Sequence, residues 1–112
     1  MSLVDLEAAK LHLRVDGEDE DGLIQIYLDA AEQAAVDFLN RNVYADQEAL
    51  DAAAEPPEAL AMVVNAPIRA AVLLILGHLY ANRENTVTGV SVQALPMGAH
   101  ALLWPYRVGL GV

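Results

Sequence analysis

The chain has 112 residues, which is enough for one compact domain with a modest core and too few for two. Hydrophobic residues make up 55% and aromatic residues only 5%, so the core must consist mainly of Ala, Leu and Val, a composition that favours packed helices over a β-sandwich. Sixteen acidic against six basic side chains give a formal charge of −10, which argues against a protein that grips the phosphate backbone of DNA.

A short first helix is expected to begin near Leu6 and to end near Arg14. Ser2 and Asp5 have the spacing of a capping box, with Asp in place of the usual Glu or Gln. Residues 16–22 then form a loop that is too acidic and too rich in glycine to pack in a core. This loop places negative charge at the positive N-terminal end of the helix that follows.

A second helix is expected from Leu23 onwards. Its apolar residues recur at steps of three and four, and its polar residues fall mostly on another face. The expected buried positions are Leu23, Tyr27, Ala30, Ala31, Ala34, Phe38 and Leu39. The expected solvent positions are Gln25, Asp29, Glu32, Gln33 and Asp37.

The middle of the chain is expected to lie on the surface. Residues 42–57 read as an irregular connection with a helical turn at about 47–53, and residues 58–64 as a short helix after two prolines. Asn65 then offers a cap for a helix that has Pro67 in its first turn. One helix kinked at that proline is the alternative.

Residues 68–83 are expected to form the main core helix. From Ala70 to Gly77 they include no polar side chain, and a helix that is apolar on all sides must be covered on all sides. The other helices of so small a domain can cover one side, so a second copy is expected to bury the other. Polar residues interrupt the apolar stretch, which argues against a membrane helix, and the acidic start argues against a secretion signal.

The last third of the chain changes pattern. Residues 85–95 alternate β-branched residues around a glycine, which predicts a hairpin or an extended arm. A turn at 96–98 and a short helix at 99–103 follow, and Pro105 is expected to end that helix because the residue before a proline disfavours the α region. Residues 108–112 form an apolar tail, which either docks on a neighbour or frays.

Catalytic and metal-binding patterns do not emerge from the sequence. If Gly22 is set at the invariant glycine of a calcium loop, Leu28 falls where the bidentate Glu belongs. His12, His78 and His100 lack the spacing of metal ligands, and the chain contains no cysteine, which excludes disulfides and thiolate sites. We therefore expect no enzyme, no cofactor and no metal.

Four strings occur in one order along the chain. They are Lys10-Leu11-His12-Leu13-Arg14-Val15-Asp16, Gly77-His78-Leu79-Tyr80-Ala81-Asn82-Arg83-Glu84, Leu95-Pro96-Met97-Gly98 and Leu102-Leu103-Trp104-Pro105-Tyr106-Arg107. Together they resemble the head-tail connector (adaptor) proteins of tailed bacteriophages, also described as phage DNA-packaging connector proteins.

That resemblance implies a mainly α fold: a bundle of about four helices with an extended hairpin or arm before a short C-terminal helix. It also implies a structural protein that forms a ring of roughly 12–13 copies between the portal and the tail, extends the DNA channel and completes the head after packaging. The implied partners are the portal protein and a tail or stopper protein, with DNA only in transient passage. The implied location is the head-tail junction of the virion, or the host cytoplasm during assembly, with no membrane.

Two groups of candidate site residues follow. The candidate subunit or portal interface comprises Tyr80, Arg83, Trp104, Tyr106, Arg107 and Leu110. The alternative for the first two is an ordinary helix end, and for the aromatic residues near Pro105 it is a small core cluster. The candidate channel-facing acids are Asp16, Glu18, Asp19, Glu20 and Asp21, or else acids within 46–51.

A function from another class also fits the charge. A small acidic helical regulator, such as a dimeric binding module or an anti-repressor that mimics DNA, would have a similar composition. The long apolar helix and the apolar tail distinguish the two hypotheses, because a soluble dimer has less need of them.

Overall fold

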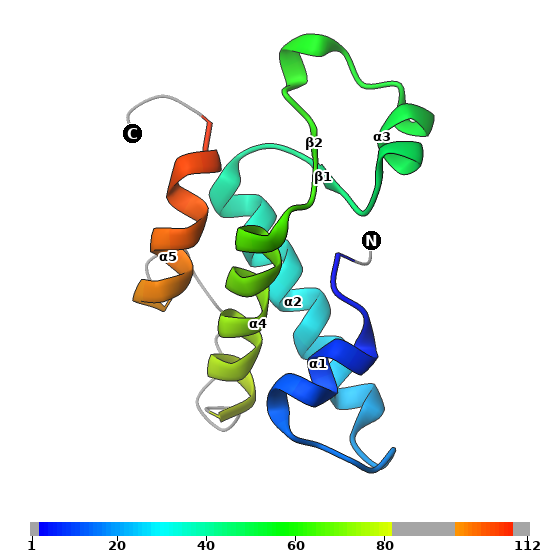
Figure 1. Ribbon diagram of the computed structural model, residues 1–112, viewed down its shortest axis with the longest axis vertical. Helices are drawn as coiled ribbons and strands as arrows, with labels where there is room; N and C mark the ends of the chain where they lie inside the picture. The colour runs from blue at the N-terminus through cyan, green and yellow to red at the C-terminus, as the bar shows by residue number, and fades with distance from the viewer. Residues whose placement is uncertain (1–2, 82–95, 109–112) are drawn as a thin grey trace.

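The computed structural model describes residues 3–81 and 96–108, and within them the chain is mainly helical (Figure 1). The helices are α1 (Leu6–Leu13), α2 (Asp21–Leu39), α3 (Gln47–Ala53), α4 (Ala66–Ala81) and α5 (Met97–Leu103). Two 3-10 turns, η1 (Pro57–Ala59) and η4 (Trp104–Tyr106), and two short strands, β1 (Val43–Tyr44) and β2 (Met62–Val63), complete these ranges. The predicted mainly α bundle is confirmed. The predicted arm at 85–95, Ser2, Arg83 and Leu110 lie outside the described residues.

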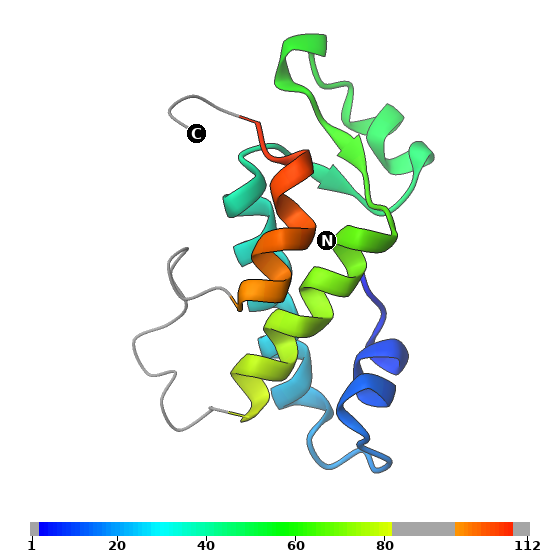
Figure 2. The same cartoon turned by 60° about the vertical axis from the view of Figure 1, so that its left-hand side comes forward.

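The core lies where α2 and α4 pack against each other, with α5 on one flank of α4 and α1 on the other (Figures 1 and 2). Fully buried side chains from both central helices fill it, and α5 adds Ala99 and Leu103. Gly77 lies where α1 approaches α4, and a Cβ there would make a tight contact of 3.3 Å with Nε2 of His12. The core is thus built from small and aliphatic residues, as the composition predicts.

The start of α1 differs from the predicted capping box. Asp5 is itself the N-cap: its Oδ1 accepts a hydrogen bond of 2.7 Å from the Ala8 amide, and its backbone is extended. The predicted end is confirmed, because Arg14 takes the left-handed conformation with φ 62°. Both ends of α1 are therefore fixed by local hydrogen bonds.

The buried face of α2 is rotated from the predicted one. Ala31, Phe38 and Leu39 are buried as expected, whereas Leu23 and Ala30 are exposed. The residues that point into the core are Ile24, Leu28, Ala31, Ala35, Val36, Phe38 and Leu39. The helix also begins at Asp21, inside the predicted acidic loop. This face follows helical steps of four and three as well, and packing against both α1 and α4 selects it over the predicted one.

The segment between α2 and α4 folds away from the bundle (Figure 1). Its predicted helical turn at 47–53 is confirmed as α3, but the predicted short helix at 58–64 is wrong. Leu60 takes φ 57° and stops η1 after a single turn, and β2 then pairs with β1 in a parallel register of Val43 with Met62. Backbone bonds from Met62 N to Asn42 O and from Val64 N to Tyr44 O hold this pair.

The two C-terminal helices begin and end differently. Asn65 caps α4 as predicted, since its Oδ1 accepts a 3.0 Å bond from the Ile68 amide, and α4 begins afresh rather than as a kinked continuation. The last helix, α5, begins at Met97 and not at Ala99. Trp104 is helical (φ −51°, ψ −46°), so Pro105 does not end the helical path there. Pro105 is instead the second residue of η4, a position in the first turn where a missing N–H costs no hydrogen bond.

Candidate functional site

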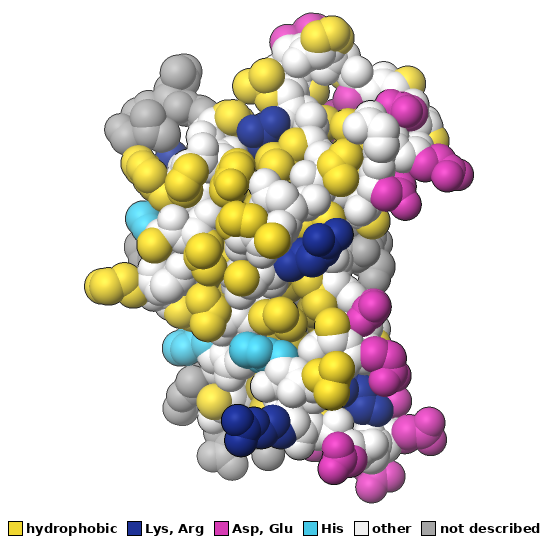
Figure 3. Space-filling model, viewed as in Figure 1, with side chains coloured by type: hydrophobic (Ala, Val, Ile, Leu, Met, Phe, Trp, Pro, Cys, Tyr) yellow, Lys and Arg dark blue, Asp and Glu magenta, His cyan; other side chains and the backbone are white. Residues whose placement is uncertain are grey.

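Charge is distributed very unevenly over this fold. All acidic residues except Glu84 lie within residues 1–58, so α4 and α5 carry none. Figure 3 shows the result on one side of the molecule: apolar side chains gather over α4 and α5, whereas the acids lie along the edge formed by the N-terminal helices and around α3. A protein with strong net negative charge thus presents a broad surface free of carboxylates.

We call this surface the acid-free face and define it by its exposed residues, Ala70, Leu74, Met97, Ala101 and Trp104. Met97 is 88% exposed, Trp104 47% and Leu74 38%. The surfaces of α4 and α5 are continuous, because Gly98 on α5 lies directly against Leu74 on α4: a Cβ on Gly98 would be 3.2 Å from Cδ1 of Leu74. Exposed apolar side chains that lie together on adjacent helices make this face a candidate contact surface for another protein.

An aromatic and cationic cluster forms the end of the acid-free face nearest η4. The Trp104 ring stacks on that of His100 (centroids 5.6 Å apart, planes 14° apart), and the His100 ring lies 4.9 Å from Phe38. The Arg107 guanidinium lies 5.3 Å from the Phe38 ring centroid and 5.8 Å from that of Trp104. Its Nε donates a 2.9 Å hydrogen bond to the Phe38 carbonyl. The indole is therefore anchored by neighbours while almost half of it remains accessible.

The same region ties the C-terminal turn to the end of α2. Arg41 donates from Nε to the Leu60 carbonyl (2.6 Å) and from Nη1 to the Tyr106 carbonyl (3.3 Å). The Val108 amide donates a 3.0 Å bond to the Leu39 carbonyl. The predicted interface residues Trp104, Tyr106 and Arg107 are thus brought together, with Tyr106 half-buried.

Tyr80 lies elsewhere. Its hydroxyl donates a 2.5 Å bond to Oε1 of Glu20, at the opposite end of α2 from Phe38. Eighteen residues of helix separate those two positions, which corresponds to about 27 Å along the axis. The predicted interface residues consequently fall into two groups at opposite ends of the bundle.

The acidic loop before α2 contains both engaged and exposed carboxylates. Lys10 Nζ lies 2.8 Å from Oδ1 of Asp21, and the hydrogen bond to this carboxylate raises the pKa of Lys10 above its ordinary value. Asp16, Glu18 and Asp19 are exposed. Of the five candidate acids, Asp21 therefore contacts α1 through Lys10 and Glu20 contacts α4 through Tyr80, whereas the other three face solvent.

Glu32 is the charged residue that the sequence assigned to the wrong side. It is only 2% exposed, and its Oε2 accepts hydrogen bonds from the backbone amides of Leu3 (2.8 Å) and Val4 (2.9 Å). Burial raises the pKa of this carboxyl, and the two amide bonds act in the opposite direction. Glu32 thus fastens the start of the chain to the middle of α2.

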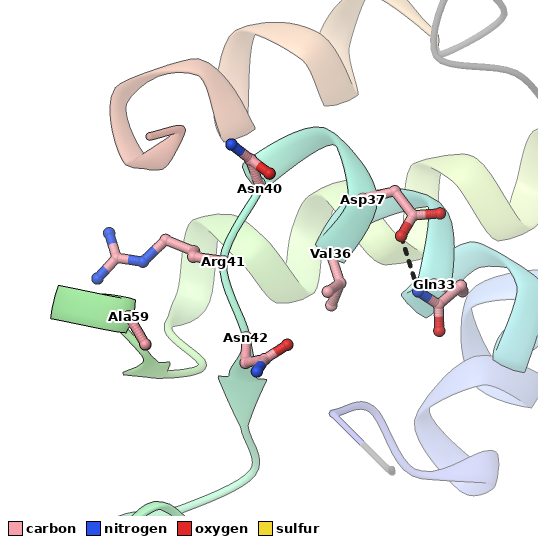
Figure 4. Close-up of a pocket in the computed structure, with 7 residues that line it drawn as sticks. All are labelled: Gln33, Val36, Asp37, Asn40, Arg41, Asn42 and Ala59. Atoms are coloured by element: carbon pink, nitrogen blue, oxygen red, sulfur yellow. Dashed lines mark hydrogen bonds between the residues drawn. The ribbon is translucent and has the colours of Figure 1, made fainter. Parts of the chain in front are cut away.

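A hollow lies beside the end of α2 (Figure 4). It has a volume of about 390 Å³ and is lined by Gln33, Val36, Asp37, Asn40, Arg41, Asn42 and Ala59. Gln33 donates to Asp37 (2.8 Å), while Arg41 points away from both. Nearby, the Tyr44 hydroxyl and the Asn42 amide both donate to Glu55, which lowers the pKa of that carboxyl. These groups satisfy one another, and the hollow brings no acid, base and nucleophile together.

The described residues meet neither the requirements of a metal site nor those of a membrane span. Within residues 3–81 and 96–108, no three His, Asp or Glu side chains gather in a way that could hold a metal ion. Nor does any helix of these ranges combine the length and apolar character that crossing a bilayer demands.

Comparison with known proteins gives one match that covers nearly the whole chain. Residues 3–107 match the family model described as phage gp6-like head-tail connector protein. No curated protein and no solved structure matches the chain.

Proposed function

The chain belongs to the family of phage gp6-like head-tail connector proteins, and from that premise we propose that it forms a ring between the portal and the tail and extends the DNA channel. The family match supports this proposal most strongly, because it extends over residues 3–107 and so covers nearly the whole chain. Membership makes the chain a structural component of the phage particle that contacts other head and tail proteins at the head-tail junction. We propose further that the ring contacts the portal protein and a tail or stopper protein, and that it completes the head after DNA packaging.

The exposed acids suit a conduit for DNA. Asp16, Glu18 and Asp19 stand free on the loop before α2, and like charge repels a duplex that must slide without being held. We assign these acids, with Glu20 and Asp21 at their base, to the channel side of the ring. The acids of α3 are the alternative, and a ring reconstruction with a neutral or basic lumen would contradict both.

The ring has a direct test. Native mass over a concentration series, with negative-stain images of the same samples, should give closed species of about a dozen copies with a DNA-wide hole, either alone or after a portal ring is added. Recruitment by the portal would support the connector role even where the free chain is monomeric. A stable dimer that ignores the portal would contradict it.

Replacing Trp104 with Ala is expected to weaken assembly more than the fold. The indole is nearly half exposed, so its removal should lower the free energy of unfolding of the monomer by only about 1–2 kcal/mol, below the cost of a fully buried Trp. Assembly should weaken at least tenfold, as for an interface anchor. Melting at a concentration where only monomer exists, compared with native mass at high concentration, separates the two. A large loss of monomer stability with assembly unchanged would identify Trp104 as a core residue.

The regulator hypothesis has less support. A mimic of DNA needs its carboxylates spread over the surface that meets a basic partner, whereas α4 and α5 contribute none. Salt should therefore weaken the chain's contacts only in part, because apolar area is insensitive to screening.

A further inference from the structure

The outer side of α2 carries a second apolar surface of opposite electrostatic character. Leu23 and Ile26 are 36% and 64% exposed, and Ala30 continues their row at helical steps of three and four. Asp29 and Asp37, both exposed, stand beside this row. We call it the α2 outer face.

The two aspartates keep their negative charge available. Asp29 accepts its hydrogen bond from Gln25 (2.9 Å) and Asp37 from Gln33 (2.8 Å), and both donors are neutral amides four residues earlier. Such a bond orients a carboxylate without neutralising it. The α2 outer face therefore combines apolar side chains with uncompensated acids.

The acid-free face has the matching features. Its outward residues on α5, Met97, Ala101 and Trp104, recur at steps of four and three, and Arg69 adds an exposed cation on α4. Because α4 packs against α2, the outer sides of these helices point in opposite directions across the bundle (Figures 1 and 2). One molecule thus presents two different surfaces, complementary in charge and both partly apolar, on opposite sides.

We propose that the acid-free face of one copy packs against the α2 outer face of the next copy. Two unlike surfaces on opposite sides give a heterologous contact, which repeats from copy to copy and closes into a ring if the rotation allows. Like surfaces cannot pair as well, because two α2 outer faces would bring their aspartates together. The inference rests on the proposed ring and adds to it the identity of the surfaces in contact.

A chain without cysteine allows this contact to be trapped selectively. Ile26→Cys and Met97→Cys place one thiol on each face, at exposed positions where the fold tolerates substitution. With a short bismaleimide, the double variant should give a ladder of covalent oligomers, whereas each single variant has no thiol across the contact and should crosslink little, with no product beyond a dimer. An equimolar mixture of the single variants should give mainly the mixed dimer. The matched control combines Ile26→Cys with Glu48→Cys on the exposed side of α3, and no ladder is expected.

A charge test uses the same readout. Asp29→Lys in the double-cysteine background should lower the yield of the ladder several-fold, because it places a cation opposite Arg69 and the cluster at Arg107. Asp51→Lys is the matched control, since Asp51 accepts the same type of bond from a glutamine four residues earlier (2.8 Å) but lies on α3. Equal effects of the two changes would overturn the pairing of faces.

The outcomes separate this inference from the proposed function. Rings or portal recruitment of the unmodified chain without a ladder from the double variant would overturn the pairing and leave the connector role standing. A ladder without any recruitment by a portal ring would support the pairing and count against the connector role. Single variants that crosslink to themselves as efficiently as the mixture would show a like-with-like contact and overturn the inference.

Discussion

Glu32→Ala is expected to lower the free energy of unfolding by about 2–4 kcal/mol. The change removes the acceptor for the amides of Leu3 and Val4, which bond to one carboxylate oxygen and belong to residues that are themselves buried. Buried donors without a partner cost more than the lost bonds alone, because they were desolvated on folding. Urea unfolding at neutral pH measures the effect, with Glu48→Ala, an exposed glutamate, as the matched control. A loss no larger than that of the control would contradict the role of Glu32.

Glu32→Gln separates the acceptor from its charge. The amide oxygen can still accept both backbone bonds, so this variant should keep most of the stability that the Ala variant loses. Burial raises the pKa of Glu32, so the folded state holds its proton to a higher pH than the unfolded state does. The contribution of this group to stability is therefore fully present below its unfolded pKa and declines as pH rises through the folded pKa. The Gln side chain does not titrate, so the free energy of unfolding of Glu32→Gln should improve relative to that of the natural chain as the pH rises from 4 to 7.

Ile75→Ala is expected to cost about 3–4 kcal/mol of unfolding free energy, because Ile75 is fully buried between the central helices and its truncation leaves a cavity. Leu74→Ala, at the adjacent position on the same helix, is the matched control. Leu74 is 38% exposed and should cost about 1 kcal/mol or less in the monomer. Chemical unfolding of both variants at low concentration gives the comparison.

The same pair is informative at high concentration. Leu74 belongs to the acid-free face, so its truncation should weaken self-association although the monomer remains stable. Ile75→Ala should do the opposite: it should lower the unfolding free energy of the monomer more than it weakens self-association. Similar unfolding free energies for the two variants would mean that α4 is buried differently from the arrangement described.

The parts of the fold that local chemistry decides were predictable from the sequence. The end of α1 at Arg14 and the cap at Asn65 follow from short-range signals, and both are confirmed. The helical turn that became α3 is another, since Asp46 caps it by accepting a bond from the Ala49 amide. These features depend on residues fewer than five positions apart, so the sequence around them contains the whole cause.

The errors arose where distant segments meet. The polar character of Glu32 predicts a position in solvent, together with the other polar residues of the helix, and only the contact with the chain at Leu3 and Val4 explains its burial. The helix predicted at 58–64 is wrong because Leu60 ends the first turn and β1, distant in sequence, pairs with Met62 and Val63. The sequence predicts an apolar side of the helix at 68–83 that needs cover, but the way this side joins the outer residues of α5 depends on how the helices pack.

The short β1–β2 pair has a consequence for how this fold can vary. Its four residues pair in parallel, so they hold two passes of the chain side by side at the spacing of paired strands, provided that the connection is long enough to cross over. Everything from Ala45 to Ala61 is therefore an excursion whose length can change at little cost, because loop closure depends only weakly on length once the base is fixed. Insertion or exchange of sequence there would alter the outline of the subunit and leave the four-helix packing beneath it in place. The outline of the subunit can therefore vary through this one segment while the core stays the same.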